Sequence, residues 1–475
     1  MSKPQLRIAF LHPDLGIGGA ERLVVDAALG LQKLGHSVDI YTSHHDPNHC
    51  FEETRDGSLR VHNVIPPFPR SAGGKLHILF AHARQLHLTT RLLSESESPY
   101  DVYFVDQLST CIPFLRFLTK KRVVFYCHFP DKLLASGEFV EGDSGRWKAG
   151  VLKGLYRLPM DLLEELTTRQ ADAILANSLF TVRVFRTYFP SINFSPTVVH
   201  PGINISAYEV AVDQNDPDVA AIRSERPTFL SLNRFERKKN VALAIQAFAA
   251  FKAIATAKQN WRLVLAGGYD PRLEDNVSTL KTLLEIATTR DLTYHILTPS
   301  KKTGTLPPFN ETVTSPDVIF LLSFTTSQRS ALLTSSSTLA LLYTPTNEHF
   351  GIVPVEAMAC GVPVLACNTG GPTESVVNSP EIEKTGWLRP PDPEVWAETL
   401  RDIVELSVDE RKMLAHRAKV RARTQFGMDA MASKIEAALL GAVRMGSVEG
   451  GSQYTFAVAF LASALVLTIA VYLVL

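Results

Sequence analysis

The chain has no excess charge of either sign and few cysteines. Its 475 residues include 48 basic and 48 acidic side chains, so the formal net charge is zero and nothing favours a nucleic-acid partner. The five cysteines are odd in number and lack metal-ligand spacing, which indicates reduced thiols rather than a disulfide framework. The N-terminus has no signal-peptide pattern. What remains is an ordinary globular protein whose length predicts two or three domains.

One long hydrophobic run is present, at the C-terminal end. Residues 454–475 carry no charged side chain. A helix over Phe456–Leu475 would cover about 30 Å, which matches the hydrocarbon core of a bilayer. A buried helix of a soluble domain is rarely apolar on all faces. We therefore predict a C-terminal membrane anchor at 454–475, with the preceding body on the cytosolic side.

Strand-like and helical runs alternate through both halves, which predicts an α/β protein with parallel sheets. Strands are expected at 7–11, 38–41, 102–105, 122–127, 173–175, 197–199, 228–232, 262–266, 318–320, 340–343 and 364–367. The expected domains are a Rossmann-like domain at 1–203, a hinge and linker at 204–226, a second Rossmann-like domain at 227–445 and the anchor. Residues 299–314 have turn chemistry and are expected to form a surface insertion.

Two glutamates eight residues apart mark the segment that is most informative about chemistry. Glu348 and Glu356 enclose the run His-Phe-Gly-Ile-Val-Pro-Val. Pro354 suits the first residue of a helix, because its missing N–H costs nothing there, and Gly361 suits the residue that ends it. Glu356 would then lie in the first turn, and the two carboxylates would flank a helix N-terminus suited to a phosphate. The plainer alternative is a glutamate that only complements the helix dipole.

A basic loop follows the first expected strand of the second half. Residues 233–240 read Asn-Arg-Phe-Glu-Arg-Lys-Lys-Asn, in which Arg234 and Lys239 can bind one anion together. In isolation, an exposed basic turn would be the better interpretation of this loop. Its position at the carboxyl end of a parallel strand, where ligands bind, favours a diphosphate site. Gly267, at another strand end, would let a ligand approach the backbone closely.

A glycine-rich turn follows the first strand. The run Gly16-x-Gly18-Gly19 continues with Glu21, so the third glycine of a dinucleotide-binding motif is missing, and Asp39 precedes the end of the second strand. Both features disfavour a nicotinamide enzyme. The loop instead offers N–H groups to a phosphate or the edge of a sugar. A purely structural turn remains the alternative.

His128 follows the strand expected at 122–127, within the run Tyr-Cys-His-Phe-Pro-Asp that ends at Asp131. A histidine at a strand end can bind the transferred sugar or assist proton movement. A core histidine is the common alternative.

Four motifs together resemble one family. They are the run His-Pro-Asp-Leu-Gly-Ile-Gly-Gly-Ala-Glu-Arg at 12–22, the run at 126–131, the basic loop at 233–240 and the two-glutamate element. Their combination is similar to the α-1,3/1,6-mannosyltransferases of the dolichol-linked oligosaccharide pathway, which are retaining glycosyltransferases of the GT-B fold. The resemblance covers residues 5–440. The chain departs from the wider pattern at Asn240, where glycine is usual.

The resemblance implies two facing Rossmann-like domains, GDP-mannose as donor and mannosyl-chitobiosyl-diphosphodolichol as the lipid-linked acceptor. It also implies α-1,3 and then α-1,6 addition at the cytosolic face of the endoplasmic reticulum membrane, with other glycosyltransferases of that pathway as candidate partners. We expect no metal or other cofactor, because Arg234 and Lys239 would stabilise the departing diphosphate.

The expected site residues form three groups. Catalytic roles are expected for His128, Arg234, Lys239 and Glu348. Donor binding is expected from Gly18, Gly19, Arg234, Lys239, Gly267, Glu348, Phe350, Gly351, Ile352 and Glu356, and acceptor binding from Gly18, Gly19, His128 and Asp131.

Other functions fit the same sequence. They are another lipid-directed retaining GT-B enzyme, such as one acting on phosphatidylinositol, a sugar-nucleotide 2-epimerase and a non-catalytic scaffold. An epimerase would not need the anchor, and a scaffold would be free to lose Glu348, Arg234 or Lys239. Residues 146–166 interleave basic and apolar side chains, which favours membrane contact, with a buried leucine-packed helix as the alternative.

Overall fold

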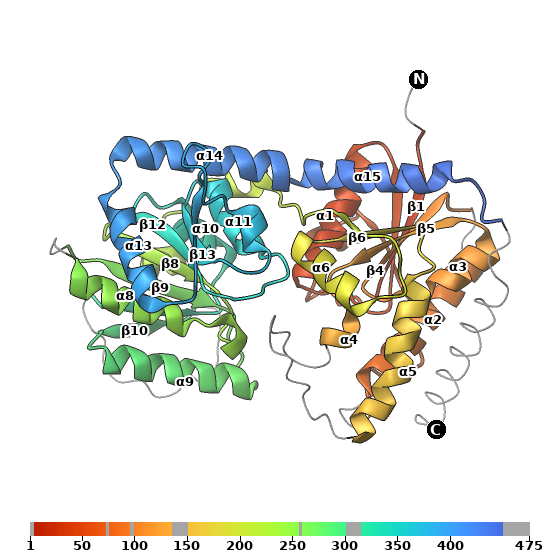
Figure 1. The fold of residues 1–475 in the computed structure, drawn as a ribbon, viewed down its shortest axis with the longest axis horizontal. Coiled ribbons are helices and arrows are strands. Elements are labelled where there is room, and N and C mark those ends of the chain that lie inside the picture. Colours follow the sequence, from red (N-terminus) through yellow and green to blue (C-terminus); the bar gives the residue numbers. More distant parts are fainter. Residues whose placement is uncertain are drawn as a thin grey trace. The chain divides into compact units, whose positions relative to one another are not determined.

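The structure is a computed structural model that describes residues 4–72, 76–95, 99–134, 151–255, 259–300 and 315–449. At residues 134 and 151–158 it describes the backbone alone. The chain divides into two compact units (Figure 1). The described part of the first extends to Gly202 and resumes at Met428, and the second comprises Ile203–Gly427.

The first unit is built on a seven-stranded sheet in the order β3-β2-β1-β4-β5-β6-β7 (Figure 1). All neighbouring strands are parallel. The strands are β1 (Arg7–His12), β2 (Ser37–Thr42), β3 (Arg60–Asn63), β4 (Val102–Asp106), β5 (Arg122–Cys127), β6 (Ala173–Ala176) and β7 (Thr197–Val198). Helices α1 (Gly19–Lys33) and α15 (Met428–Arg444) cover one face, and α2 (His77–Glu95), α3 (Ile112–Thr119) and α6 (Leu179–Tyr188) cover the other. Because both faces are covered, the central strands are almost continuous apolar runs.

The second unit has a parallel sheet in the order β10-β11-β9-β8-β12-β13-β14. Its strands are β8 (Thr228–Leu232), β9 (Arg262–Gly267), β10 (Tyr294–Leu297), β11 (Val318–Leu322), β12 (Thr338–Tyr343), β13 (Val364–Cys367) and β14 (Gly386–Arg389). Helices α8 (Ala242–Ile254), α9 (Glu274–Thr289) and α13 (Pro393–Glu405) cover one face. Helices α7 (Pro217–Ile222), α10 (Thr326–Thr334), α11 (Ile352–Cys360) and α14 (Val408–Phe426) cover the other.

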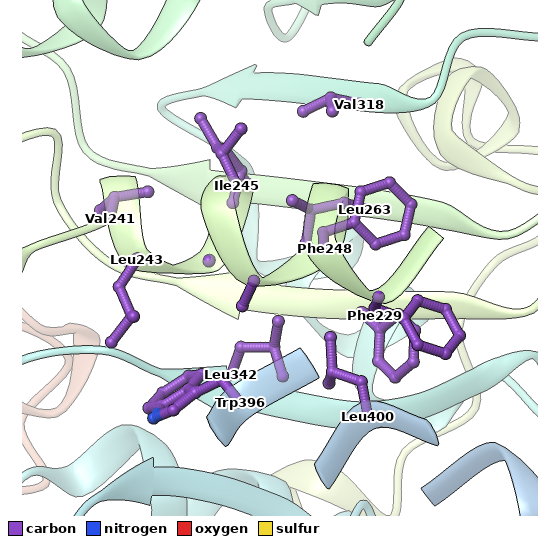
Figure 2. Close-up of a cluster of buried hydrophobic side chains, with 14 of the residues drawn as sticks. Phe229, Val241, Leu243, Ile245, Phe248, Leu263, Val318, Leu342, Trp396 and Leu400 are labelled. Carbon is purple, nitrogen blue, oxygen red and sulfur yellow. The ribbon is translucent and has the colours of Figure 1, made fainter. Parts of the chain in front are cut away.

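Figure 2 shows the core beneath α8 and α13. Trp396 of α13 and Phe248 of α8 lie over the strand residues Phe229 and Leu342. Trp396 is fully buried, and its indole N–H donates to the carbonyl oxygen of Pro390 at 2.9 Å. The buried polar group is therefore satisfied, as a packed core requires.

The predicted class of two parallel-sheet α/β units is confirmed. The strands expected at 122–127, 228–232 and 364–367 have the observed bounds, and the others differ by at most two residues at an end. Strands β3, β10 and β14 were not predicted. All three are edge strands of four residues, and an edge strand needs no long apolar run.

The structure corrects two predicted boundaries. Residues 428–445 were assigned to the second domain, but Ile435 and Leu439 of α15 are buried in the core of the first unit. Residues 204–226 were assigned to a linker, but Ile222 is buried in the core of the second unit. The apolar stripe of a helix shows that it covers a sheet, not which sheet it covers.

The predicted anchor at 454–475 lies outside the described residues, as do 301–314 of the predicted insertion and 146–150 of the basic-apolar segment. Within the described ranges, no helix is both long enough and apolar enough to cross a membrane. The remainder of the basic-apolar segment belongs to α5 (Val151–Thr168), in which Met160 and Leu163 are buried and Leu162 is exposed.

The assignment of α15 to the first unit generates a prediction. Ile435 is fully buried, so Ile435→Ala should destabilise the first unit by about 2–5 kcal/mol, as truncation of buried aliphatic side chains does. Hydrogen exchange followed by mass spectrometry should show faster exchange in β1 and β4, with β8 and β9 unchanged. The matched control is Ile403→Ala in α13, also fully buried, which should act on the second unit. Equal effects of Ile435→Ala on both sheets would contradict the division.

Candidate functional site

Each sheet has one topological switch point, a pair of adjacent strands from which the chain continues toward opposite edges of the sheet. This switch point lies between β1 and β4 in the first unit and between β8 and β12 in the second. Connections leave toward opposite faces there, so a crevice forms at the carboxyl ends of the strands, where doubly wound proteins bind their ligands. Most of the polar residues singled out from the sequence follow these four strands or their neighbours.

In the second unit, Lys239 and Glu348 form an ion pair although they are 109 residues apart in sequence. Lys239 ends the short 3-10 helix η3 (Arg237–Lys239) after β8, and Glu348 lies in the loop after β12. The ammonium Nζ donates to Oε2 at 2.5 Å, and both side chains are mostly buried. Burial acts to raise the pKa of Glu348, but Lys239, with weaker help from His349 and Lys238, lowers it. A cation and an ionised carboxylate are thus fixed next to each other at the switch point.

Helix α11 begins earlier than predicted. Its first residue is Ile352, so Pro354 is the third residue and Glu356 lies in the second turn rather than the first. The reason is Gly351, whose φ of 83° turns the chain into the helix two residues earlier. Gly361 ends the helix as predicted. No side chain of the described structure caps the N-terminus, which leaves it suited to an anion.

Two glycines after β13 fix the loop that carries Glu348. A Cβ on Gly370 would lie 2.6 Å from the backbone of Glu348, and one on Gly371 would lie 2.2 Å from Cα of Phe350. The N–H of Gly371 also donates to the carbonyl oxygen of Glu348 at 2.7 Å. Phe350, a predicted donor contact, is buried with its ring against Phe426. Its side chain therefore belongs to the core, and a ligand would meet its backbone.

Two residues that the sequence did not single out hold Glu356. The hydroxyl of Tyr208, in the 3-10 helix η2 (Ile205–Tyr208), donates to Oε1, and Nη1 of Arg329 donates to the same oxygen at 3.1 Å. Burial, followed by the charge of Glu356, raises the pKa of Tyr208, so its hydroxyl remains a donor. No described residue donates to the second oxygen, Oε2, which therefore keeps its capacity to accept a hydrogen bond. The distances in sequence are too long for any local pattern to find this pair.

Arg234 and Lys239 do not share a partner among the described residues. The guanidinium of Arg234 contacts Glu236 at 2.8 Å, and its side chain is 61% exposed. Their joint binding of one anion therefore stays a prediction. Gly267 has a structural role as well, because a Cβ there would lie 1.8 Å from the carbonyl oxygen of Asn233. Glycine lets the end of β9 pass against the basic loop.

The backbone conformation at position 240 explains why asparagine can replace the usual glycine after Lys239. Its φ is 47°, in the left-handed region. Asparagine is among the few residues other than glycine that adopt this conformation routinely. The turn that positions Lys239 is therefore preserved.

In the first unit, the carboxylate of Glu21 lies over the N-terminus of α1, beside the glycine-rich loop. Gly18 precedes α1, and a Cβ on Gly18 would lie 2.2 Å from Oε2 of Glu21, which folds back over the N-terminus. Gly19 has open space around it. A carboxylate here already complements the helix dipole and repels a phosphate. The geometry thus favours a hydroxyl-bearing sugar over a phosphate at this loop.

His128 lies beside a buried carboxylate. Its Nε2 is 2.7 Å from Oδ1 of Asp106 at the end of β4, and Nδ1 of His12 at the end of β1 hydrogen-bonds to Oδ2 of Asp106 at 2.8 Å. The three residues meet because β1, β4 and β5 are adjacent parallel strands that end together. The sequence singled out His128 alone, since a buried aspartate gives no local signal of its partners.

The charges of this cluster are set by mutual contact. Burial acts to raise the pKa of Asp106, but His128 and His12 lower it to about 2. For His12, burial acts to lower the pKa, and the hydrogen bond and charge of Asp106 raise it. Asp106 is therefore ionised at neutral pH. Within the described residues, no group of three or more histidine, cysteine, aspartate or glutamate side chains has the arrangement of a metal site.

Asp131 begins the short helix α4 (Asp131–Leu134), which Glu164 of α5 holds in place. The N–H groups of Asp131 and Lys132 donate to Oε1 and Oε2 of Glu164 at 2.7 and 3.0 Å. Burial, followed by the charge of Asp131, raises the pKa of Glu164 to about 7, although the two N–H groups oppose the shift. Glu164 was not predicted as a site residue, and it holds the backbone at Asp131 and Lys132, shortly after His128.

Comparison with known proteins defines the class. Residues 17–207 match the family model described as Glycosyltransferase Family 4, and residues 212–302 and 311–421 match Glycosyl transferases group 1. Sucrose-phosphate synthase from Thermosynechococcus elongatus has a similar fold, with a TM-score of 0.68, 18% identity and coverage of 93% of this chain and 100% of that chain. The catalytic domain of starch synthase IV from Arabidopsis thaliana has a TM-score of 0.66 and 14% identity, with coverage of 93% of this chain and 100% of that chain. The chain is a glycosyltransferase of the GT-B fold.

Curated relatives narrow the class to one family. Alpha-1,3/1,6-mannosyltransferase ALG2 of Rhizomucor pusillus is 46% identical over 93% of this chain and 92% of its own length. The protein of the same name in Saccharomyces cerevisiae is 41% identical over 92% of this chain and 85% of its own length. The chain belongs to the ALG2 family of α-1,3/1,6-mannosyltransferases. Membership supports the mannosyltransferase interpretation over the phosphatidylinositol-directed enzyme and the non-catalytic scaffold.

The contacts of Glu164 generate a prediction about stability and pH. Because the pKa of Glu164 is raised from 4.5 to about 7, the folded state holds a proton between these values that the unfolded state has lost. Stability contributed by this group is therefore lost as pH rises through that window, by up to about 3 kcal/mol. Glu164→Gln should lack this loss, so its stability relative to the wild type should increase from pH 5 to pH 8 in urea unfolding.

The adjacent Glu165 provides the control, because contacts with Ser191 and Lys132 outweigh burial and lower its pKa. Glu165→Gln should show no increase in relative stability with pH. An equal pH trend in both variants would exclude Glu164 as its source.

Proposed function

We propose that the protein transfers mannose from GDP-mannose to mannosyl-chitobiosyl-diphosphodolichol, adding α-1,3 and then α-1,6 mannose on the cytosolic face of the endoplasmic reticulum. Family membership supports the linkage chemistry. The observation that carries the proposal is the Lys239–Glu348 pair beside the uncapped N-terminus of α11, at the switch point of the second sheet.

The second unit is proposed to bind the donor. Lys239, with Arg234, would stabilise the charge that develops on the departing diphosphate, together with the first N–H groups of α11. Glu348 would accept hydroxyls of the mannose. Glu356, with Oε2 able to accept a hydrogen bond, would accept hydroxyls of the ribose. Gly267 and Gly351 would allow close approach to the backbone because they have no side chain. Ile352 would contribute its N–H as the first residue of α11.

The first unit is proposed to bind the lipid-linked acceptor. His128 and Asp131 lie on one short segment, and Gly18 and Gly19 begin α1 on a neighbouring loop. The carboxylate of Glu21 over Gly18 suits sugar hydroxyls and not a phosphate, so we assign this loop to acceptor sugars. His128 would meet a hydroxyl at the reaction centre.

The hydrophobic run at 454–475 is proposed to anchor the protein in the membrane that holds the acceptor. Its sequence length and lack of charge support this role. Confinement to a surface raises the effective concentration of enzyme and lipid without any contact at the site. Other glycosyltransferases of the cytosolic pathway would be its neighbours there.

The direct test is a transfer assay with the purified full-length protein. GDP-mannose and UDP-glucose are offered with a phytanyl diphosphate chitobiose that carries one mannose. Products with one and two added mannoses are expected from GDP-mannose alone, sensitive to linkage-specific mannosidases. Transfer from UDP-glucose, or none to this acceptor, would refute the proposal.

Lys239→Ala should reduce kcat at least about a hundredfold, because loss of one group that stabilises a leaving group costs about 3 kcal/mol in the transition state. The matched control is Lys238→Ala, whose side chain is 54% exposed and contacts Glu236. It should transfer at nearly the wild-type rate, and circular dichroism should show both variants folded. Near-normal turnover of Lys239→Ala would remove Lys239 from the reaction.

Chelation tests the proposed electrostatics. If Arg234 and Lys239 stabilise the diphosphate, excess EDTA should leave most of the transfer rate in place. The measurement is the initial rate in EDTA, and again after addition of magnesium or manganese. Loss of activity in EDTA with recovery on metal addition would assign the stabilising charge to a metal ion.

A further inference from the structure

Three aspartates in or beside the first sheet, among the residues that the structure describes, have buried side chains but different partners. Asp172 is paired with Arg116 at 2.9 Å and Arg122 at 2.8 Å, and Asp39 with Arg60 at 2.7 Å. Arginine keeps its charge at all physiological pH values, so it is an effective partner for a structural carboxylate. Asp106 differs from both, because the side chains it contacts are two imidazoles.

The position of Asp106 also differs. Asp172 forms its ion pair with Arg122, the first residue of β5. Asp106 is instead the last residue of β4, at the switch point of the sheet. Its carboxylate is 1% exposed and lies between His12, equally buried, and His128, whose side chain is 18% exposed. A buried ionised group thus reaches the ligand-binding edge through one partly exposed ring.

The contacts of His128 leave its ring one open nitrogen. Nε2 is 2.7 Å from Oδ1 of Asp106, an ion-pair distance at which the ring N–H does not point at the oxygen well enough to form a hydrogen bond. The negative charge of the carboxylate beside Nε2 still favours a hydrogen on this nitrogen over one on the distant Nδ1. The backbone is held as well, because Nδ2 of Asn177 donates to the carbonyl oxygen of His128 at 2.8 Å. The ring also lies against Tyr126, with centroids 4.9 Å apart. Nδ1 has no hydrogen-bond partner among the described residues.

We propose that Asp106 is a positioning residue that fixes the proton of His128 on Nε2, so that Nδ1 accepts a hydrogen bond from a substrate hydroxyl. His12 holds the second carboxylate oxygen and so fixes the orientation of Asp106. The proposal rests on the proposed function in assigning His128 to the reaction. A positioned carboxylate behind a histidine sets which nitrogen is protonated, and its neutral replacement costs orders of magnitude in kcat elsewhere.

The kinetic test uses Asp106→Asn in the full-length protein. Asparagine keeps the shape but can turn its amide toward Nε2 and stabilise the wrong tautomer. We expect kcat to fall at least about a hundredfold, with the KM for GDP-mannose changed less than threefold, because the donor residues belong to the second unit. Asp172→Asn, which removes a buried charge at the opposite end of the same sheet, should leave kcat within about threefold if it folds. Equal loss in both variants would make Asp106 merely structural.

A second pair of variants keeps the proposal falsifiable if Asp106→Asn does not fold. In His12→Asn the side-chain nitrogen occupies the place of Nδ1 and can donate to Asp106, whereas His12→Ala removes the donor. We expect His12→Asn to keep most of the activity and His12→Ala to lose at least tenfold in kcat. Equal activities would overturn the role of His12 in orienting the carboxylate.

A readout independent of transfer separates this inference from the proposed function. Diethyl pyrocarbonate acylates unprotonated imidazole nitrogens, and mass spectrometry of peptides locates the product. Acylation at His128 should proceed at the unprotonated Nδ1 in the wild type and be severalfold slower in Asp106→Asn, whose amide favours a hydrogen on Nδ1, with His62, 46% exposed, as the internal reference. An unchanged rate at His128 would overturn the contact with Asp106. If the acylation rate at His128 depends on Asp106 as expected but the protein does not transfer mannose, the inference about Asp106 stands and only the proposed function is refuted.

Discussion

The common direction of the strands is the constraint on which both candidate sites depend. Every sheet pairing in the described structure is parallel, so all strands of a sheet end at the same edge. Parallel strands need a crossover, and the crossover changes side once in each sheet. Residues far apart in sequence, such as Lys239 and Glu348, therefore emerge side by side. The ammonium group of Lys239 and the carboxylate of Glu348 thus come within 2.5 Å although 109 residues separate them in sequence.

The two switch points present different chemistry. In the second unit a lysine, a carboxylate and a free helix N-terminus lie together, which suits an anionic group linked to a sugar. In the first unit the helix N-terminus is already covered by Glu21, and the partly exposed group is His128, which lies beside the buried carboxylate of Asp106. This difference is the basis of our proposal that the phosphate-bearing ligand binds to one unit and hydroxyl-bearing ligands bind to the other. Each unit reaches its assignment from its own contacts.

Glycine and asparagine contribute by conformation and by lack of bulk. Gly351 adopts a left-handed conformation that starts α11, and Gly370 and Gly371 let two loops pack backbone to backbone behind Glu348. Asn240 takes the left-handed conformation in place of glycine after Lys239. A side chain at Gly371 would displace the Glu348 loop, because its Cβ would overlap the backbone of Phe350. The precision of the ion pair is therefore a property of the surrounding backbone.

The sequence by itself determined the alternation of strands and helices, the strand ends that carry polar residues and the family. Apolar runs bounded by turn residues are local signals, and motifs such as Glu-x7-Glu are read without a fold. Only the tertiary structure decided that α15 returns to the first sheet, that α11 starts at Ile352, and that Asp106, Tyr208 and Arg329 hold predicted site residues. These depend on which surfaces meet and on backbone conformation at single residues, and neither leaves a periodic pattern along the chain.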